Sequence, residues 1–201
     1  MSNMLRLCVL LPISVLCMSC GRATAPSPAL PAYVNVEFRQ ALIAPTKCDG
    51  RMWDGFETPN PAAASLVARA LGATNPYAAV IGVLASPTMA ALEKPEPFGT
   101  ARLMLGGVAA ATVPLETMAQ DTLTPIWNAA PLKSVPLAPS TRIEVELWDR
   151  DISEDDPMGA GTVTYQDLLG ALQTGTLYHV RLAEQTMNQV LFLDVSVYPA
   201  S

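Results

Sequence analysis

The sequence has one histidine and four cysteines, and three of those cysteines, Cys8, Cys17 and Cys20, lie in the first twenty residues. It contains no Gly-x-Ser-x-Gly motif, no Cys–His pair and no His-rich metal motif, so nucleophilic and zinc catalysis lack their residues. His179 lies in a strand-like run far along the chain from the acidic stretches. Closely spaced carboxylates can serve glycoside hydrolysis, but nothing marks a sugar cleft. We therefore expect no enzymatic activity, and a fold that rests on its core and not on disulfides.

Basic residues and long apolar runs are also scarce. The chain has 12 Lys and Arg against 18 Asp and Glu, a net charge of −6, so it offers no basic stripe for a nucleic acid. The apolar run Leu7–Leu16 is too short to cross a membrane as a helix. Because it follows Arg6 and precedes small residues, residues 1–20 are typical of a secretory signal peptide.

The end of this signal predicts a lipid anchor. Cys17-Met-Ser-Cys20 resembles a bacterial lipobox, in which the last cysteine is lipidated; Cys17 stands where leucine is usual, and ordinary cleavage nearby is the alternative. Residues 21–32 are rich in Pro, Ala and Ser and are predicted to form a semi-rigid tether. Gly21 is not the aspartate that commonly retains lipoproteins at the inner membrane. We expect an exported protein in the cell envelope, anchored at the outer membrane.

The remaining residues, 33–199, predict one all-β domain, an eight-stranded antiparallel sandwich with short helical insertions. Apolar and polar residues alternate over 34–38 and 191–198, as in half-buried strands. Shorter strand-like runs are Tyr77–Leu84, Thr100–Leu105, Ile143–Trp148, Thr162–Tyr165 and Leu177–Leu182. Helices are predicted at Pro61–Leu71, Ser86–Leu92 and Asp167–Leu172, the first two because a proline opens each.

The most informative segment is Ile143–Gly159, a strand followed by a short turn with four aspartates and a glutamate. Carboxylates this dense repel one another, so the turn is either a solvated tip or a site for a hard cation such as Ca²⁺. An EF-hand is excluded, because its sixth position is Glu154 and its twelfth is Ala160.

Together with Thr122-Leu-Thr-Pro-Ile-Trp-Asn128, this segment resembles the C2 domain family, the membrane-binding β-sandwich of protein kinase C and synaptotagmins. In that family a segment of type Thr-Leu-Asn-Pro-x-Trp-Asn precedes a strand that ends in Asp-x-Asp, followed by Asp-x-x-Gly. Asp149, Asp151, Asp156 and Gly159 match the second pattern. Residues 34–38 resemble the first strand of the family, and Asn75-Pro76-Tyr77 stands where Asp-Pro-Tyr is usual.

The resemblance implies a calcium site between two loops. Its ligands are expected from Asp149, Asp151 and Asp156, with Asp155 and Asp156 competing for one role because the loop is a residue short. The loop after the first strand is unusually long and supplies Asp49 and Asp54, and Asn75 replaces a bridging aspartate. Such separated oxygen ligands bind calcium weakly, at about 10⁻⁴–10⁻³ M.

The resemblance further implies docking to membrane phospholipid or to an envelope protein. Membrane contacts are expected from Met52, Trp53, Phe56, Ile152 and Met158, as apolar tips beside the metal. The alternative is that Trp53 and Phe56 cap the core under the long loop. Trp127 is expected in the core. The leading prediction is thus a calcium-binding domain, and the other is a calcium-independent interaction or structural lipoprotein on the same scaffold.

Overall fold

The computed structural model describes residues 29–47, 49–53, 60–117, 119, 121–151, 154–182 and 189–201, and residues Pro31–Ser201 form one compact unit. The strands are β1 (Tyr33–Ile43), β2 (Pro97–Leu105), β3 (Val108–Glu116), β4 (Leu132–Pro136), β5 (Arg142–Asp149), β6 (Asp156–Thr164), β7 (Tyr178–Arg181) and β8 (Val190–Pro199). The helices are α1 (Pro61–Leu71), α2 (Pro76–Leu84), α3 (Pro87–Ala90) and α4 (Tyr165–Thr174). No helix among these residues has the length and apolar character to cross a membrane.

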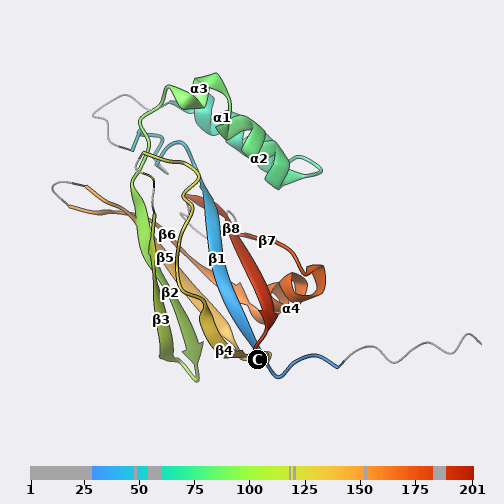
Figure 1. Ribbon diagram of the computed structural model, residues 1–201. Coiled ribbons are helices and arrows are strands. Elements are labelled where there is room, and N and C mark those ends of the chain that lie inside the picture. The colour runs from blue at the N-terminus through green and yellow to red at the C-terminus, as the bar shows by residue number, and fades with distance from the viewer. Residues whose placement is uncertain are drawn as a thin grey trace, which may run out of the picture. The chain divides into compact units, whose positions relative to one another are not determined.

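The strands form two four-stranded antiparallel sheets, in the orders β4-β1-β8-β7 and β3-β2-β5-β6 (Figure 1). The prediction of an eight-stranded antiparallel sandwich is confirmed. Consecutive side chains of a strand point to opposite faces, and in β5 the alternation runs from buried Ile143 through Val145 to Leu147, with Glu144 and Glu146 between them on the outer face.

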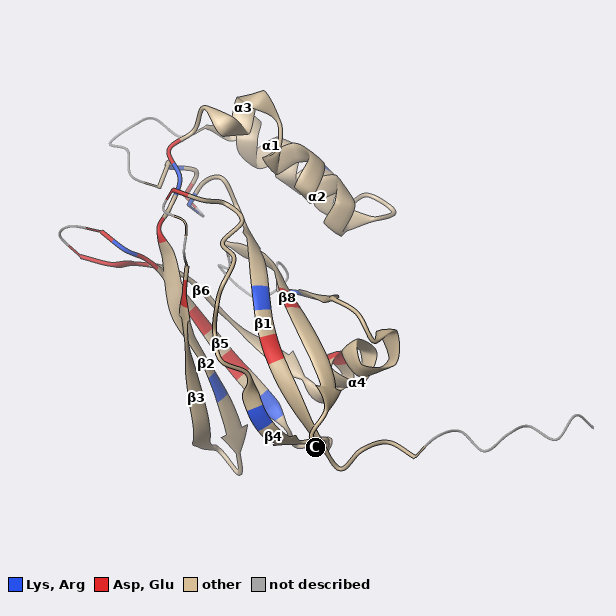
Figure 2. Cartoon of the chain, in the orientation of Figure 1, with Lys and Arg blue, Asp and Glu red and all other residues tan. Residues whose placement is uncertain are grey.

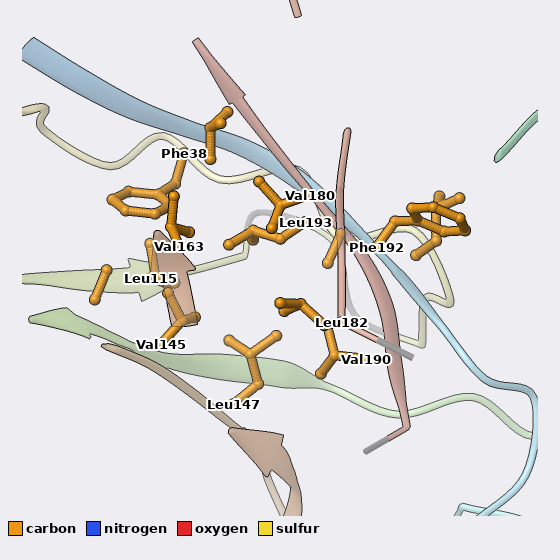
Figure 3. Close-up of a cluster of buried hydrophobic side chains, with 14 of the residues drawn as sticks. Phe38, Leu115, Val145, Leu147, Val163, Val180, Leu182, Val190, Phe192 and Leu193 are labelled. Carbon is orange, nitrogen blue, oxygen red and sulfur yellow. The ribbon is translucent and has the colours of Figure 1, made fainter. Parts of the chain in front are cut away.

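Apolar side chains from both sheets fill the space between them. Phe38, Val180 and Leu193 come from one sheet, and they face Val145 and Leu147 from the other (Figure 3). All five side chains are buried, and each contributes about 1.5–3 kcal/mol by leaving water. Trp127 is also buried, as predicted.

A segment before β4 closes one side of the sandwich. The Ile43 amide donates a 2.8 Å hydrogen bond to the Leu123 carbonyl, and the Trp127 amide donates one of 3.0 Å to the Arg39 carbonyl. Thr117 also bridges to Trp127. This segment therefore runs along β1 and connects it to the end of β3.

The helices are insertions whose starts are set by capping residues and prolines. Asn60 accepts a hydrogen bond from the Ala63 amide at the start of α1, Pro61 follows it, and the helix has the predicted bounds. The short helix expected at Ser86–Leu92 is α3, and the one expected at Asp167–Leu172 is the longer α4.

One predicted strand is wrong. Residues 77–84 form α2, because Asn75 caps a helix that Pro76 begins, and the buried side chains of Val80 and Leu84 recur at helical spacing. The strand run predicted at Thr162–Tyr165 ends one residue earlier, where Tyr165 begins α4. Strands β3 and β4 were not predicted.

Candidate functional site

Three segments meet at one end of the sandwich, which we call the loop end. They are residues 44–47 and 49–53 after β1, residues 93–96 before β2, and the described residues of the β5–β6 hairpin. The Arg150 amide donates a 3.1 Å hydrogen bond to the Glu96 carbonyl, and the Glu96 amide donates one of 2.7 Å to Asp149 Oδ1. The chain enters β1 at Tyr33, which lies at the opposite end of the same sandwich (Figure 1).

Asp149 is the buried base of the loop end. Its exposed fraction is 0 %, and its main chain pairs with Asp156 across β5 and β6 and with Pro97 across β5 and β2. The backbone amide of Glu96 satisfies one oxygen of the buried Asp149 side chain. Strands β5 and β6 thus place the main chains of Asp149 and Asp156 opposite each other, while their role as calcium ligands stays a prediction.

Asp156 is paired with a lysine from the other loop. Lys47 Nζ forms a salt bridge with Asp156 Oδ2, and the Lys47 side chain is only 16 % exposed while that of Asp156 is 44 % exposed. The same ammonium group lies 5.7 Å from the ring centroid of Trp53, within the range of a cation–π contact. Two segments far apart in the sequence are thus joined by one cation of the chain itself.

Asp49 has its own partner in a tight turn. It accepts hydrogen bonds from the Arg51 amide at 3.0 Å and from Arg51 Nε at 2.6 Å. The bond from the Arg51 backbone, followed by that from its guanidinium, lowers the pKa of Asp49. Gly50 allows this turn because its φ of 85° is in the left-handed region.

The tip of the β5–β6 hairpin carries the remaining acidic residues. Asp155 Oδ1 accepts a 3.2 Å hydrogen bond from the Asp151 amide, and Glu154 is exposed beside it. Figure 2 shows acidic segments along this hairpin and at the neighbouring start of β2. Arg150 on the same hairpin pairs with Glu116 at 2.9 Å and lies 4.7 Å from the Phe98 ring.

These residues, as they lie, do not fit a calcium ion. Calcium needs six to eight oxygen ligands around one centre, but within the described ranges no three Asp, Glu, His or Cys side chains are grouped to hold a metal. Instead Lys47 and Arg51 satisfy the carboxylates of Asp156 and Asp49.

Asn75 does not join the loop end. Its side chain accepts a 3.2 Å hydrogen bond from the Ala78 amide at the start of α2, and the next residues pack against β8 through Tyr77. The acidic–Pro–aromatic order that the resemblance predicts occurs instead at Glu96-Pro97-Phe98, where β2 begins. Glu96 is thus the loop-end residue that sequence reasoning missed, and this tripeptide was the signal for it.

Three of the predicted membrane contacts are wrong. The exposed fractions of the side chains are only 8 % for Met52, 2 % for Trp53 and 0 % for Met158. Trp53 packs in the core and donates a 2.9 Å hydrogen bond to the Ala44 carbonyl. Met158 faces the interior from β6. The alternative, in which Trp53 caps the core, is confirmed. The remaining predicted site residues, Cys20, Asp54, Phe56 and Ile152, lie outside the described residues, as do the signal peptide and residues 21–28 of the tether.

Comparison with known proteins gives a family match. A model of the C2 domain family matches residues 68–180, more than half of the chain. No curated protein sequence matches it.

Solved structures with low identity are also similar. Calcium-bound Extended-Synaptotagmin 2, in a structure of two of its C2 domains, is 16% identical over 84% of this chain and 46% of its own, with a TM-score of 0.44. A C2 domain of plant Extended Synaptotagmin 1 is 11% identical over 86% and 99%, with a TM-score of 0.46. Human GIVD cytosolic phospholipase A2 is 13% identical over 86% and 17%, with a TM-score of 0.45. The chain therefore spans less than half the length of two of these proteins.

Proposed function

The chain belongs to the C2 domain family, and we propose that it is a non-catalytic docking domain of an exported, lipid-anchored envelope protein, whose loop end binds a positively charged protein surface. The observation that carries this proposal is the concentration of carboxylates at the loop end, from Glu96 and Glu116 to Asp151, Glu154 and Asp155. The described residues of the loop end carry more acidic than basic side chains, and such an excess of one charge attracts a complementary partner and sets its orientation.

The place where the chain enters the domain supports the same proposal. Tyr33 opens β1 at the end opposite the loop end. A tether attached at this end of the domain does not have to pass the loop end. Anionic lipid repels an acidic surface, so a basic protein is the better partner for this end in the absence of calcium.

The second candidate is calcium-dependent docking to membrane phospholipid. Family membership favours it, as does the position of Asp149 directly across from Asp156 on β5 and β6. It requires Lys47 to leave Asp156 and further oxygen ligands to move in, because no three Asp, Glu, His or Cys side chains of the described residues are grouped to hold a metal.

Binding of the full chain to two probes separates the candidates. One probe is poly-L-lysine, a basic polypeptide, and the other is vesicles of phosphatidylglycerol and phosphatidylethanolamine. Each is measured with chelator and with calcium at about 2 mM, a concentration above the dissociation constant expected for separated oxygen ligands. We expect binding to poly-L-lysine in chelator that weakens with salt. Binding to vesicles only in calcium would establish the second candidate, and binding to neither probe would contradict both.

A charge-matched pair of double variants locates the surface. Glu154→Gln with Asp155→Asn removes two exposed charges from the hairpin, and we expect about fivefold weaker binding to poly-L-lysine. The control, Glu37→Gln with Glu144→Gln, removes two charges from the outer faces of the sheets. If the control variant loses the same amount of affinity for poly-L-lysine, the binding comes from the net negative charge of the protein and the loop end has no specific part in it.

A further inference from the structure

The Lys47 ammonium group occupies a position that joins the two loops of the loop end. It reaches from residues 44–53 to Asp156 on the β5–β6 hairpin, and Asp156 lies directly opposite the buried Asp149. Among the salt bridges of the described residues, none of the others links these two segments.

The lysine is held in place by its surroundings. Its own amide donates a 2.8 Å hydrogen bond to the Arg51 carbonyl, and its carbonyl accepts one of 2.8 Å from Gly50. Trp53, which is fixed in the core by its bond to Ala44, lies beside the ammonium group. A backbone fixed in this way reduces the conformational entropy that a lysine loses when it forms an ion pair.

We propose that Lys47 is a built-in cation that takes the place of calcium at the loop end, so that the two loops stay joined without a metal ion. This inference shares with the proposed function only its location at the loop end. It replaces the calcium site that the sequence predicted with a salt bridge of the chain's own.

Electrostatics explain why calcium does not displace the lysine. Separated oxygen ligands of this kind bind calcium at about 10⁻⁴–10⁻³ M even without competition. A unit positive charge about 4 Å from a bound ion weakens its binding by about a thousandfold or more near a protein surface. Calcium at millimolar concentration therefore does not occupy the loop end while Lys47 is paired with Asp156.

The test compares Lys47→Met with wild type in the full chain, using calcium and terbium as probes. Wild type is expected to show no change in melting temperature up to about 10 mM calcium and no terbium emission sensitised by tryptophan. In Lys47→Met the ammonium charge is gone while the length of the side chain is nearly kept. Asp156 then lacks its cation, and we expect calcium to gather further oxygen ligands from the two loops and from water around it. The melting temperature should therefore rise by about 3–6 °C at the same calcium concentration, together with terbium emission excited through tryptophan.

Two further variants serve as controls. Lys47→Arg keeps the charge and should remain insensitive to calcium. Lys133→Met makes the same change at an exposed lysine on β4, outside the loop end, and should also leave the wild-type behaviour unchanged. If Lys47→Met does not fold, Lys47→Gln replaces it as a neutral variant with a polar end.

The proposal is overturned if wild type responds to calcium with the same midpoint as Lys47→Met. It is equally overturned if neither folded neutral variant responds more than wild type. Binding to poly-L-lysine is measured separately in chelator, so a failed docking experiment leaves this result unaffected.

Discussion

The Tyr77 hydroxyl donates a 2.5 Å hydrogen bond to Oδ2 of Asp194, a carboxylate that is fully buried on β8. Tyr77 comes from α2, so this bond ties the helical insertion to the outer face of the sheet. His179 Nδ1 lies 2.8 Å from the other oxygen of Asp194, and its ring stacks on that of Tyr77 with centroids 3.4 Å apart. Gln40 completes the group with a 2.9 Å hydrogen bond to the tyrosine oxygen.

Removing the Tyr77 hydroxyl should destabilise the domain. In Tyr77→Phe a buried carboxylate loses a donor, which typically costs about 1–3 kcal/mol. Urea denaturation measures the difference. The matched control is Tyr198→Phe, because the Tyr198 hydroxyl also donates to a carboxylate, that of Glu37 at 3.0 Å, but at an exposed position. We expect a loss below about 0.5 kcal/mol there; equal losses would contradict a special role for the buried bond.

The same tyrosine predicts a loss of stability in alkali. Burial, followed by the hydrogen bond to Asp194 and the charge of that carboxylate, raises the pKa of Tyr77 above its ordinary value of 10.0. A raised pKa in the folded state stabilises the domain fully below the unfolded pKa, and this contribution is lost as the pH rises above about 10. The free energy of unfolding should therefore fall more steeply between about pH 9.5 and about pH 11.5 in wild type than in Tyr77→Phe. Parallel curves would contradict the prediction.

The sequence predicted the framework of the fold because long alternating strands are local patterns. It failed at residues 77–84, where apolar residues suggested a strand and the structure has α2. Yet an asparagine that caps the helix, followed by proline, opens α2 as it opens α1, at Asn75-Pro76 and Asn60-Pro61. Helix α3 begins with the similar pair Ser86-Pro87, although the Ser86 side chain makes no capping hydrogen bond. The resemblance of Asn75-Pro76-Tyr77 to a family motif outweighed this capping signal. Strand β3 was overlooked because it is rich in alanine, although Gly106-Gly107 marks its hairpin.

The candidate site was predictable only in part. A strand that ends in Asp-x-Asp, followed by a short turn and a second strand, predicts that Asp149 and Asp156 lie near each other. In the structure the two residues are paired across β5 and β6. The Lys47–Asp156 pair joins residues 109 positions apart. No local pattern reveals such a contact, because it depends on where the tertiary fold places Lys47 relative to the hairpin.

Two glycines give opposite predictions for the same substitution. A Cβ at Gly99 would lie 2.0 Å from the Glu146 carbonyl oxygen, so β2 and β5 would have to separate. We expect Gly99→Ala to lower the free energy of unfolding by about 2–3 kcal/mol. A Cβ at Gly82 in α2 meets nothing within 4 Å, and Gly82→Ala should raise stability by about 0.5–1 kcal/mol. Thermal and urea denaturation test both, and destabilisation by Gly82→Ala would contradict the helical position of this residue.

The proposed lipid anchor predicts a difference between two neighbouring cysteines. The proposed lipid modification at Cys20 would attach acyl chains, each of which would add about 0.8 kcal/mol of membrane affinity per buried methylene group. Cys20→Ser should therefore move the expressed chain from the membrane fraction to the soluble or unprocessed fraction, and mass spectrometry should show the loss of acyl mass. Cys17→Ser changes a nearby cysteine that is not the lipidated position of the lipobox pattern. This variant should stay in the membrane fraction, as wild type does. Equal acyl mass on wild type and Cys20→Ser would contradict the anchor.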